Sequence, residues 1–239
     1  MSDNRPIGVF DSGIGGITVL KALRARLPHE DLVYLGDTAR LPYGTKSAET
    51  VTAYALQTTR HLLEHDVKMI VIACNTASSV ALGPLTRALA PIPVIGVIEP
   101  GARASVAATK SHHIAVIATE ATVRVGAYVR AIHDIDPEAH VVQEPCALFV
   151  TLAEEGWLSG EVVEAAARHY LTPLFRRKAR PDTLVLGCTH FPVLKRTIRK
   201  VVGAGVKLVD SAETTAKAVE AALADKGLAT KRRGRGRNK

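Results

Sequence analysis

Two cysteines follow apolar segments that lie far apart in the sequence. Cys74 comes after MIVIA and before NTA, and Cys188 comes after TLVLG and before THF. Short runs of aliphatic and β-branched residues are typical of buried strands. A single buried cysteine is usually a core residue, but here each thiol is followed by polar residues. Such a repeated arrangement predicts that both thiols take part in chemistry.

The type of chemistry follows from the number and spacing of these thiols. A thiol hydrolase needs one cysteine, and a redox pair favours the CxxC spacing, which this chain lacks. Two thiols at equivalent strand ends instead favour a pair of opposed acid/base groups. One would remove a proton from a carbon and the other would deliver a proton to its opposite face. A free thiol titrates near pH ~8.5, so modest tuning gives one thiol and one thiolate.

Two further residues lie where they could handle protons beside the thiols. Asp11 ends the apolar segment PIGVF, and His190 is two residues after Cys188. In an extended segment, positions two apart share a face, so the imidazole can activate the thiol. The glycines after Asp11 (SGIGG) match neither GxGxxG nor a P-loop. They indicate backbone N–H groups at a helix N-terminus that face an anion, with simple helix capping by Asp11 or Ser12 as the alternative.

Helical and strand-like segments alternate along the chain. Eight strands are expected, at PIGVF, DLVYLGD, KMIVIAC, IPVIGVI, HIAVIAT, AHVVQEP, DTLVLGC and VKLVD. Strands that are apolar on both faces and alternate with helices predict parallel sheets covered on both sides. The predicted fold class is therefore α/β, with two doubly wound parallel-sheet lobes. A single eight-fold β/α barrel is the alternative, although barrels of that kind usually need about 250 residues.

The proline and glycine in GVIEPGA indicate a boundary between lobes. We expect lobe 1 at residues 1–98, lobe 2 at 99–208, and a return of 209–228 to lobe 1. Ligands of open parallel sheets bind at the carboxyl ends of the strands. The active site is accordingly expected in the cleft between the lobes, where Asp11, Cys74 and Cys188 would meet.

Composition supports a globular protein. The 239 residues are 47% hydrophobic and 23% charged, and no apolar run reaches the ~18 residues needed to span a membrane. The segment MSDNRPIGVFDSG does not resemble a signal peptide. The three cysteines do not suggest a disulfide scaffold, and no pair has the spacing of metal ligands. We therefore expect a cytoplasmic protein without a metal.

The positive charge is concentrated at one end of the chain. The formal net charge is +8, and six positive residues lie in Lys231–Lys239 without an acidic one. The remaining residues carry only +2. We expect residues 229–239 to form a disordered basic tail. A solvated terminus is the simpler interpretation, and nonspecific contact with nucleic acid is the alternative.

Five sequence blocks resemble the glutamate racemases of the cofactor-independent aspartate/glutamate racemase family. The blocks are GVFDSGIGG, YLGDTARLPYG, ACNTAS, GVIEPG and LGCTHFPVL, and the resemblance covers nearly all of the chain except its basic tail. It implies two α/β lobes related by pseudo-twofold symmetry, with the active site between them. It also implies interconversion of L- and D-glutamate, without pyridoxal phosphate or metal, to supply D-glutamate for peptidoglycan.

The resemblance also implies roles for individual residues. Cys74 resembles the base that acts on D-glutamate, Cys188 the base that acts on L-glutamate, and Asp11 and His190 their assisting groups. Glu154 matches a third assisting acid. Substrate contacts map to Asp11, Ser12, Tyr43, Gly44, Asn75, Thr76, Thr122, Thr189 and His190.

Two of the assignments have structural alternatives. The family pattern has proline where this chain has Thr151, and Glu155 adjoins Glu154, so Glu154 as a solvated helix charge is the alternative. Cys146 matches a family position without a catalytic role, and we expect it to be a buried structural residue.

Other functions stay open at the level of sequence. The nearest is racemisation of another amino acid, such as aspartate, whose side chain is one methylene shorter. A binding module that reuses a two-lobed fold without catalysis is a different class. Glutamate is the expected small-molecule partner, a homodimer is compatible with the sequence, and no membrane partner is expected.

Overall fold

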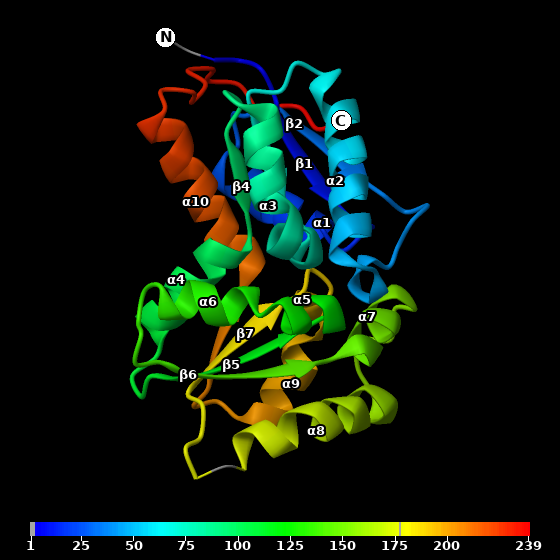
Figure 1. Cartoon of the computed structure of the whole chain (residues 1–239), viewed down its shortest axis with the longest axis vertical. Helices are drawn as coiled ribbons and strands as arrows, with labels where there is room; N and C mark the ends of the chain where they lie inside the picture. Colours follow the sequence, from blue (N-terminus) through cyan, green and yellow to red (C-terminus); the bar gives the residue numbers. More distant parts are fainter. Residues whose placement is uncertain (1–2, 177) are drawn as a thin grey trace. The chain divides into compact units, whose positions relative to one another are not determined.

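The computed structural model describes residues 3–176 and 178–239, which divide into two compact units (Figure 1). Unit 1 comprises the described residues up to Val97 together with Ala212–Lys239, and unit 2 comprises Ile98–Ser211. Among the described residues, each unit contains one parallel sheet of four strands. The predicted α/β class with two parallel sheets is confirmed, and the barrel alternative is wrong.

The sheet of unit 1 has the strand order β2-β1-β3-β4. Its strands are β1 (Ile7–Asp11), β2 (Leu32–Gly36), β3 (Met69–Ile72) and β4 (Val94–Gly96). Its helices are α1 (Ile17–Arg26), η1 (Tyr43–Thr45), α2 (Ala48–Leu63), α3 (Asn75–Leu89) and α10 (Ser211–Asp225).

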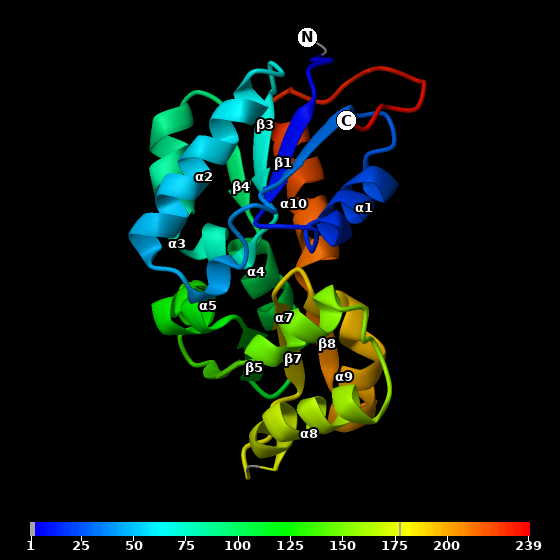
Figure 2. The ribbon, with the colours of Figure 1, turned by 90° about the vertical axis from the view of Figure 1, so that its right-hand side faces the viewer.

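Alternating side chains of the central strands of unit 1 supply two cores. Phe10 and Ile72 pack with α2 and α3, while Val9 and Val71 pack with α1 and α10. Figure 2 shows these helix pairs on opposite sides of the sheet. Because successive strand residues point to opposite faces, apolar runs without polar interruptions are what a sheet covered on both sides requires.

Unit 2 repeats this pattern with the strand order β6-β5-β7-β8. Its strands are β5 (His113–Ala118), β6 (His140–Pro145), β7 (Thr183–Gly187) and β8 (Lys207–Asp210). Its helices are α4 (Ile98–Ala108), α5 (Glu120–Val125), α6 (Ala127–His133), α7 (Ala147–Glu154), α8 (Glu161–Phe175), η2 (Phe191–Leu194) and α9 (Lys195–Val202). The α7, α8 and α9 helices pack on one face of the sheet, and α4 and α6 pack on the other (Figure 1).

Three local expectations differ from the structure. The strand expected at IPVIGVI is only Val94–Gly96, and α4 begins at Ile98 because Pro100 is tolerated in a first helical turn. The helix expected after β5 is split into α5 and α6 at Gly126, whose φ is +67°. The sequence predicts that the chain returns to lobe 1 at residue 209, within β8, but β8 pairs with β7 of unit 2, and the return to unit 1 begins at Ala212 in α10.

The basic tail, which the sequence predicts to be disordered, lies along the edge of β2 (Figure 2). The backbone N–H of Leu32 donates to Arg237 O at 2.9 Å, and that of Tyr34 donates to Lys239 O at 2.9 Å. Arg232 forms an ion pair with Asp31 at 2.8 Å. The composition of the tail does not predict this pairing, because the pairing uses backbone groups. An edge strand offers unpaired backbone N–H and C=O groups to any extended segment.

Within the residues that the structure describes, no helix is both long and apolar enough to cross a membrane.

Candidate active site

Asp11 and Cys74 leave the sheet of unit 1 at the same edge. Phe10 of β1 pairs with Ile72 of β3, so the residues that follow these two strands are neighbours. Both side chains are buried, and the Cys74 thiol donates a hydrogen bond to Ser12 Oγ at 3.4 Å. The structure therefore brings together a carboxylate, a hydroxyl and a thiol that the sequence predicted as site residues.

Cys74 is the residue that caps the N-terminus of α3. Its sulfur accepts a hydrogen bond from the Ala77 N–H at 3.4 Å, and Asn75 and Thr76 form the buried first turn of the helix. Burial and, next, the negative charge of Asp11 raise the pKa of the Cys74 thiol to about 11, against smaller lowering effects of Ser12 and Ala77. Cys74 is therefore a protonated thiol at neutral pH. This shift is larger than the modest tuning that the sequence predicts, because burial strongly disfavours the charged form of the thiol.

Tyr43 and Gly44 lie in η1 of the same unit, and both are buried. The Tyr43 hydroxyl donates to Asp37 Oδ2 at 2.5 Å, and Asp37 also pairs with Arg40 at 2.7 Å. The Tyr43 hydroxyl therefore donates its proton to a hydrogen bond within the protein. Asp37 is not among the site residues that the sequence predicts. It follows β2 directly, much as Asp11 ends β1, and this position at a strand end could have indicated it.

Cys188 begins a chain of polar groups in unit 2. Its Sγ lies 3.7 Å from His190 Nδ1, and His190 Nε2 lies 2.6 Å from Glu154 Oε1. Glu154 is the last residue of α7, and the Phe149 and Phe191 rings pack edge to face, which holds α7 against η2. A thiol next to an imidazole that is oriented by a carboxylate is an arrangement that can activate the thiol as a nucleophile or base.

The adjacent residues Glu154 and Glu155 differ in their contacts. Both residues are exposed at the end of α7, but the Glu154 carboxylate is bonded to His190 and its side chain is only 27% exposed. The ion pair with His190 favours the assisting role for Glu154 over a purely solvated charge. Thr151, which replaces the family's proline, lies in the middle of α7 and leaves the helix intact.

Two predicted substrate contacts of unit 2 lie at the same sheet edge as Cys188. Thr189 is buried beside the thiol. Thr122 is buried in α5, after β5, and its hydroxyl lies 3.0 Å from that of Thr119, the capping residue of α5. Ala118 at the end of β5 pairs with Gly187 at the end of β7. The sheet thus directs both threonines toward the edge that carries Cys188.

Cys146 is fully buried in the core of unit 2, with its sulfur 3.7 Å from Glu144 O. Burial, and then the charges of Glu144 and Cys188, raise the pKa of the Cys146 thiol. A thiol that is held protonated and packed among apolar side chains fits the structural role expected from the sequence.

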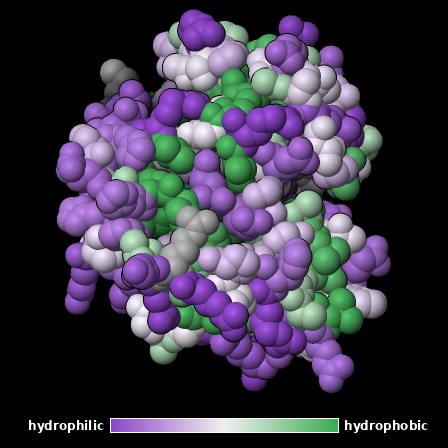
Figure 3. Space-filling model, turned by 60° about the horizontal axis from the view of Figure 1, so that its bottom comes forward, coloured by the Kyte–Doolittle hydropathy of each residue, from purple (hydrophilic) through white to green (hydrophobic). Residues whose placement is uncertain are grey.

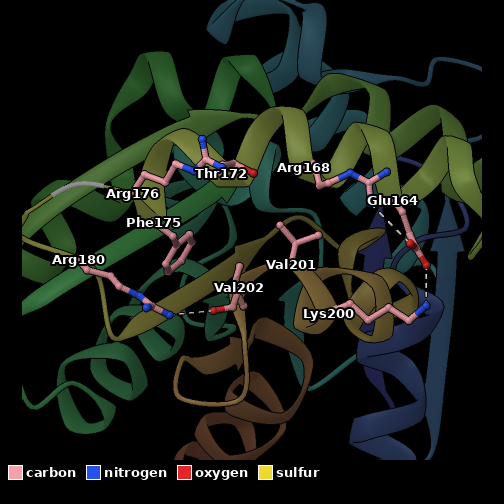
Figure 4. Close-up of a pocket in the computed structure, with 9 residues that line it drawn as sticks. All are labelled: Glu164, Arg168, Thr172, Phe175, Arg176, Arg180, Lys200, Val201 and Val202. Carbon is pink, nitrogen blue, oxygen red and sulfur yellow. Dashed lines mark hydrogen bonds and ion pairs between the residues drawn. The ribbon is translucent and has the colours of Figure 1, made fainter.

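A pocket of about 440 Å³ lies elsewhere on unit 2, between α8 and α9. Figure 4 shows Lys200 and Arg168 reaching toward Glu164, and Lys200 Nζ lies 2.6 Å from Glu164 Oε1. The face in Figure 3 carries many hydrophilic side chains with hydrophobic patches between them. None of the predicted site residues lines this pocket, and its arginines are exposed, so we assign it no part in the site.

Comparison with known proteins gives consistent matches over most of the chain. Residues 17–219 match the model of the family described as Asp/Glu/Hydantoin racemase. A protein named glutamate racemase from Geobacter metallireducens is 57% identical over 215 residues, which is 90% of this chain and 78% of the relative. The crystal structure of glutamate racemase from Francisella tularensis in complex with D-glutamate has a TM-score of 0.90 and 43% identity, covering 99% of this chain and 88% of that one.

A more distant match has a similar fold but a low sequence identity. The aspartate racemase of Picrophilus torridus has a TM-score of 0.64 but only 17% identity, over 95% of both chains. It therefore shares the fold with this chain and supports nothing further.

Proposed function

Because the chain belongs to the Asp/Glu/Hydantoin racemase family, we propose that it interconverts L-glutamate and D-glutamate by moving the α-proton. The observation that carries the proposal is the presence of two buried thiols at equivalent strand ends, Cys74 near the charge of Asp11 and Cys188 beside His190 and Glu154. The high identity to proteins named glutamate racemase favours glutamate as the substrate.

The two thiols have different starting states in the proposed reaction. From L-glutamate, the Cys188 thiolate takes the α-proton, after the imidazole of His190 has accepted the thiol proton with support from Glu154. Cys74, which is protonated at neutral pH, then delivers its proton to the opposite face of the α-carbon. The products are D-glutamate, a Cys74 thiolate, a Cys188 thiol and a His190 imidazolium that still holds the original thiol proton of Cys188. From D-glutamate, the same transfers run in reverse.

Substrate binding is proposed to use hydrogen bonds and a helix terminus. The N-terminus of α3 carries Asn75 and Thr76 and favours a carboxylate, because its backbone N–H groups and dipole are positive. The other proposed contacts are Ser12, Tyr43, Gly44, Thr122 and Thr189. The thiols transfer the proton themselves, so the proposal needs neither pyridoxal phosphate nor a metal.

The proposed role is to supply D-glutamate for peptidoglycan in the cytoplasm. All three cysteines are free thiols, which fits a reducing compartment. A homodimer, and contact of nucleic acid with Lys231–Lys239, stay predictions.

The test is proton NMR with D-glutamate in deuterated water, combined with optical rotation. The protein should remove the α-proton signal while the rotation decays. Cys74→Ala and Cys188→Ala should each lower turnover by at least ~10³-fold, since general acid–base groups contribute up to ~10⁴-fold. Cys146→Ala is the matched control and should keep turnover within a few-fold.

Other outcomes would contradict the proposal in distinguishable ways. Exchange with aspartate and none with glutamate would keep the mechanism and change the substrate. Full turnover in either Cys74→Ala or Cys188→Ala would remove the two-thiol mechanism. An absence of exchange with any amino acid would leave a binding function instead.

A further inference from the structure

Tyr34 of β2 reaches from the sheet into the loop that follows β1. It pairs in register with Val9, and its ring packs on the core between the sheet, α1 and α10. Its hydroxyl donates to Gly13 O at 2.6 Å. A phenylalanine ring would serve this core equally well, so the hydroxyl needs an explanation outside the core.

The bond from Tyr34 is one of two hydrogen bonds that hold Gly13, and we call the pair, with Asp11 and Tyr34, the Gly13 clamp. The backbone N–H of Gly13 donates to Asp11 Oδ2 at 3.0 Å, while its carbonyl accepts from Tyr34. The residue between Asp11 and Gly13 is Ser12, whose hydroxyl accepts from the Cys74 thiol. Both polar groups of Gly13 are therefore fixed, and with them the turn that presents Ser12 to the sulfur.

Two glycines provide the room that the clamp requires. A Cβ at Gly36 would lie 2.4 Å from Gly13 O. A Cβ at Gly16 would lie 2.4 Å from Asp11 Cβ and 2.9 Å from Tyr34 Oη. Real Cβ atoms do not approach so closely, so the turn packs against β2 only because both positions lack side chains.

The hydroxyl keeps its proton in this setting. Burial, followed by the charges of Asp11 and Cys74, raises the pKa of Tyr34. It therefore donates to Gly13 over the whole pH range in which the enzyme would work, and it does not compete for the α-proton.

We propose that Tyr34 is a positioning residue, which holds the Asp11–Gly13 turn so that Asp11 and Ser12 meet the Cys74 sulfur. This inference rests on the proposed two-thiol racemisation. Tyr34 acts through Gly13 and does not touch the substrate. Loss of its hydroxyl should slow proton transfer at Cys74 and leave proton transfer at Cys188 unchanged.

The test is Tyr34→Phe, studied with both enantiomers of glutamate. We expect kcat/KM to fall about tenfold in both directions, because small misplacements of reacting groups are costly and the equilibrium constant ties the two directions together. Tyr170→Phe is the matched control, because it removes a hydroxyl that accepts from the Leu148 N–H within unit 2. It should leave kcat/KM within about twofold.

Isotope effects separate positioning from a loss of folded protein. With C2-deuterated D-glutamate, Cys74 takes the deuteron, so slowing that step should increase the primary isotope effect on kcat/KM. With C2-deuterated L-glutamate, Cys188 takes the deuteron, so the isotope effect should decrease. A lower fraction of folded enzyme changes neither ratio, which keeps the test valid even if Tyr34→Phe is less stable.

A double-mutant cycle with Ser12→Ala adds a second test. If Tyr34 acts by positioning Ser12 and Asp11, the two substitutions should be less than additive in kcat/KM. Wild-type isotope effects in Tyr34→Phe would overturn the inference while leaving racemisation intact. A wild-type protein that does not racemise glutamate would instead remove the proposed function.

Discussion

The strands β3 and β7 occupy the same place in their sheets, and both lead to a cysteine, but they are anchored by opposite charges. Lys68, just before β3, is fully buried, and its Nζ lies 2.6 Å from Glu30 Oε2, 2.6 Å from Asp3 O and 2.8 Å from Leu228 O. Asp182, just before β7, accepts hydrogen bonds from the loop before β5. The donors are Thr109 Oγ1 at 2.6 Å, Lys110 N at 2.7 Å and Ser111 N at 2.9 Å.

This difference follows from how the chain builds each unit. Unit 1 consists of two separate segments, so its anchor has to join the start of the chain, the loop before β2 and the segment after α10. Unit 2 is continuous, and its anchor only holds the loop that precedes β5. Lys68 in unit 1 therefore connects more separate segments than Asp182 does at the same position of the sheet in unit 2.

The opposite ends of the two strands differ in chemistry. Cys74 has a carboxylate and a hydroxyl as neighbours, whereas Cys188 has an imidazole backed by a carboxylate. A nearby negative charge opposes ionisation of Cys74, while a neighbouring imidazole can accept the proton of Cys188. Two similar strand ends are thus suited to opposite starting roles, with Cys74 as the acid.

The largest effect is expected from the anchor of β3. Lys68→Met keeps an unbranched, slightly shorter side chain but leaves Glu30 buried without its ion-pair partner, which should lower the free energy of unfolding by about 3–5 kcal/mol. Urea unfolding followed by circular dichroism measures this. The control Lys226→Met, at an exposed lysine, should stay within about 0.5 kcal/mol of the original protein.

The anchor of β7 should matter less. Asp182→Asn should lower the free energy of unfolding by about 1–2 kcal/mol, because only part of the charge-assisted bonding is lost. Burial by itself raises the pKa of Asp182, but its hydrogen bonds hold that pKa at about 2. Since this is below the ordinary value of ~3.9, the contribution should be complete above that pH and disappear as the pH falls toward 2. Equal losses of unfolding free energy in Lys68→Met and Asp182→Asn would show that the anchor of β3 is not the stronger one.

The chemical contrast predicts that Glu154→Gln lowers kcat by about tenfold or more, because the glutamine no longer stabilises an imidazolium at His190. The neighbouring Glu155→Gln is the matched control and should stay within about twofold. Steady-state racemisation assays measure both variants. Equal losses in the two variants would show that the bond from Glu154 to His190 has no special role.

The smallest effect concerns the acidity of Cys74. Asp11→Asn should lower the pKa of Cys74, because the negative charge that raises it is removed while an oxygen that accepts from Gly13 is kept. In a Cys188→Ala background, the pH dependence of Cys74 alkylation by iodoacetamide, followed by mass spectrometry, reports this pKa. Asp225→Asn, at an exposed position, should leave the profile in place. A profile that is unchanged by Asp11→Asn would mean that burial alone sets the pKa.

Some parts of the site were accessible from the sequence. The apolar runs before Cys74 and Cys188 predicted strands that end at a thiol, because covered parallel strands need apolar residues on both faces. His190 was accessible through its proximity to Cys188 in the sequence, although the predicted extended segment is wrong, because residues 188–190 form a turn after β7. Glu154 required resemblance to a family, since nothing in a helix of this composition tells which of two adjacent glutamates bonds to His190.

By itself, the sequence determined the α/β class, the strands that carry the thiols and the residue types available at their ends. These features depend on local periodicity, which short windows of sequence contain. The tertiary structure decided which charges neighbour each thiol, how Tyr34 and Asp11 share Gly13, and how the basic tail pairs with β2. Those contacts join residues distant in sequence, and their energies depend on burial and geometry that exist only once the sheets have formed.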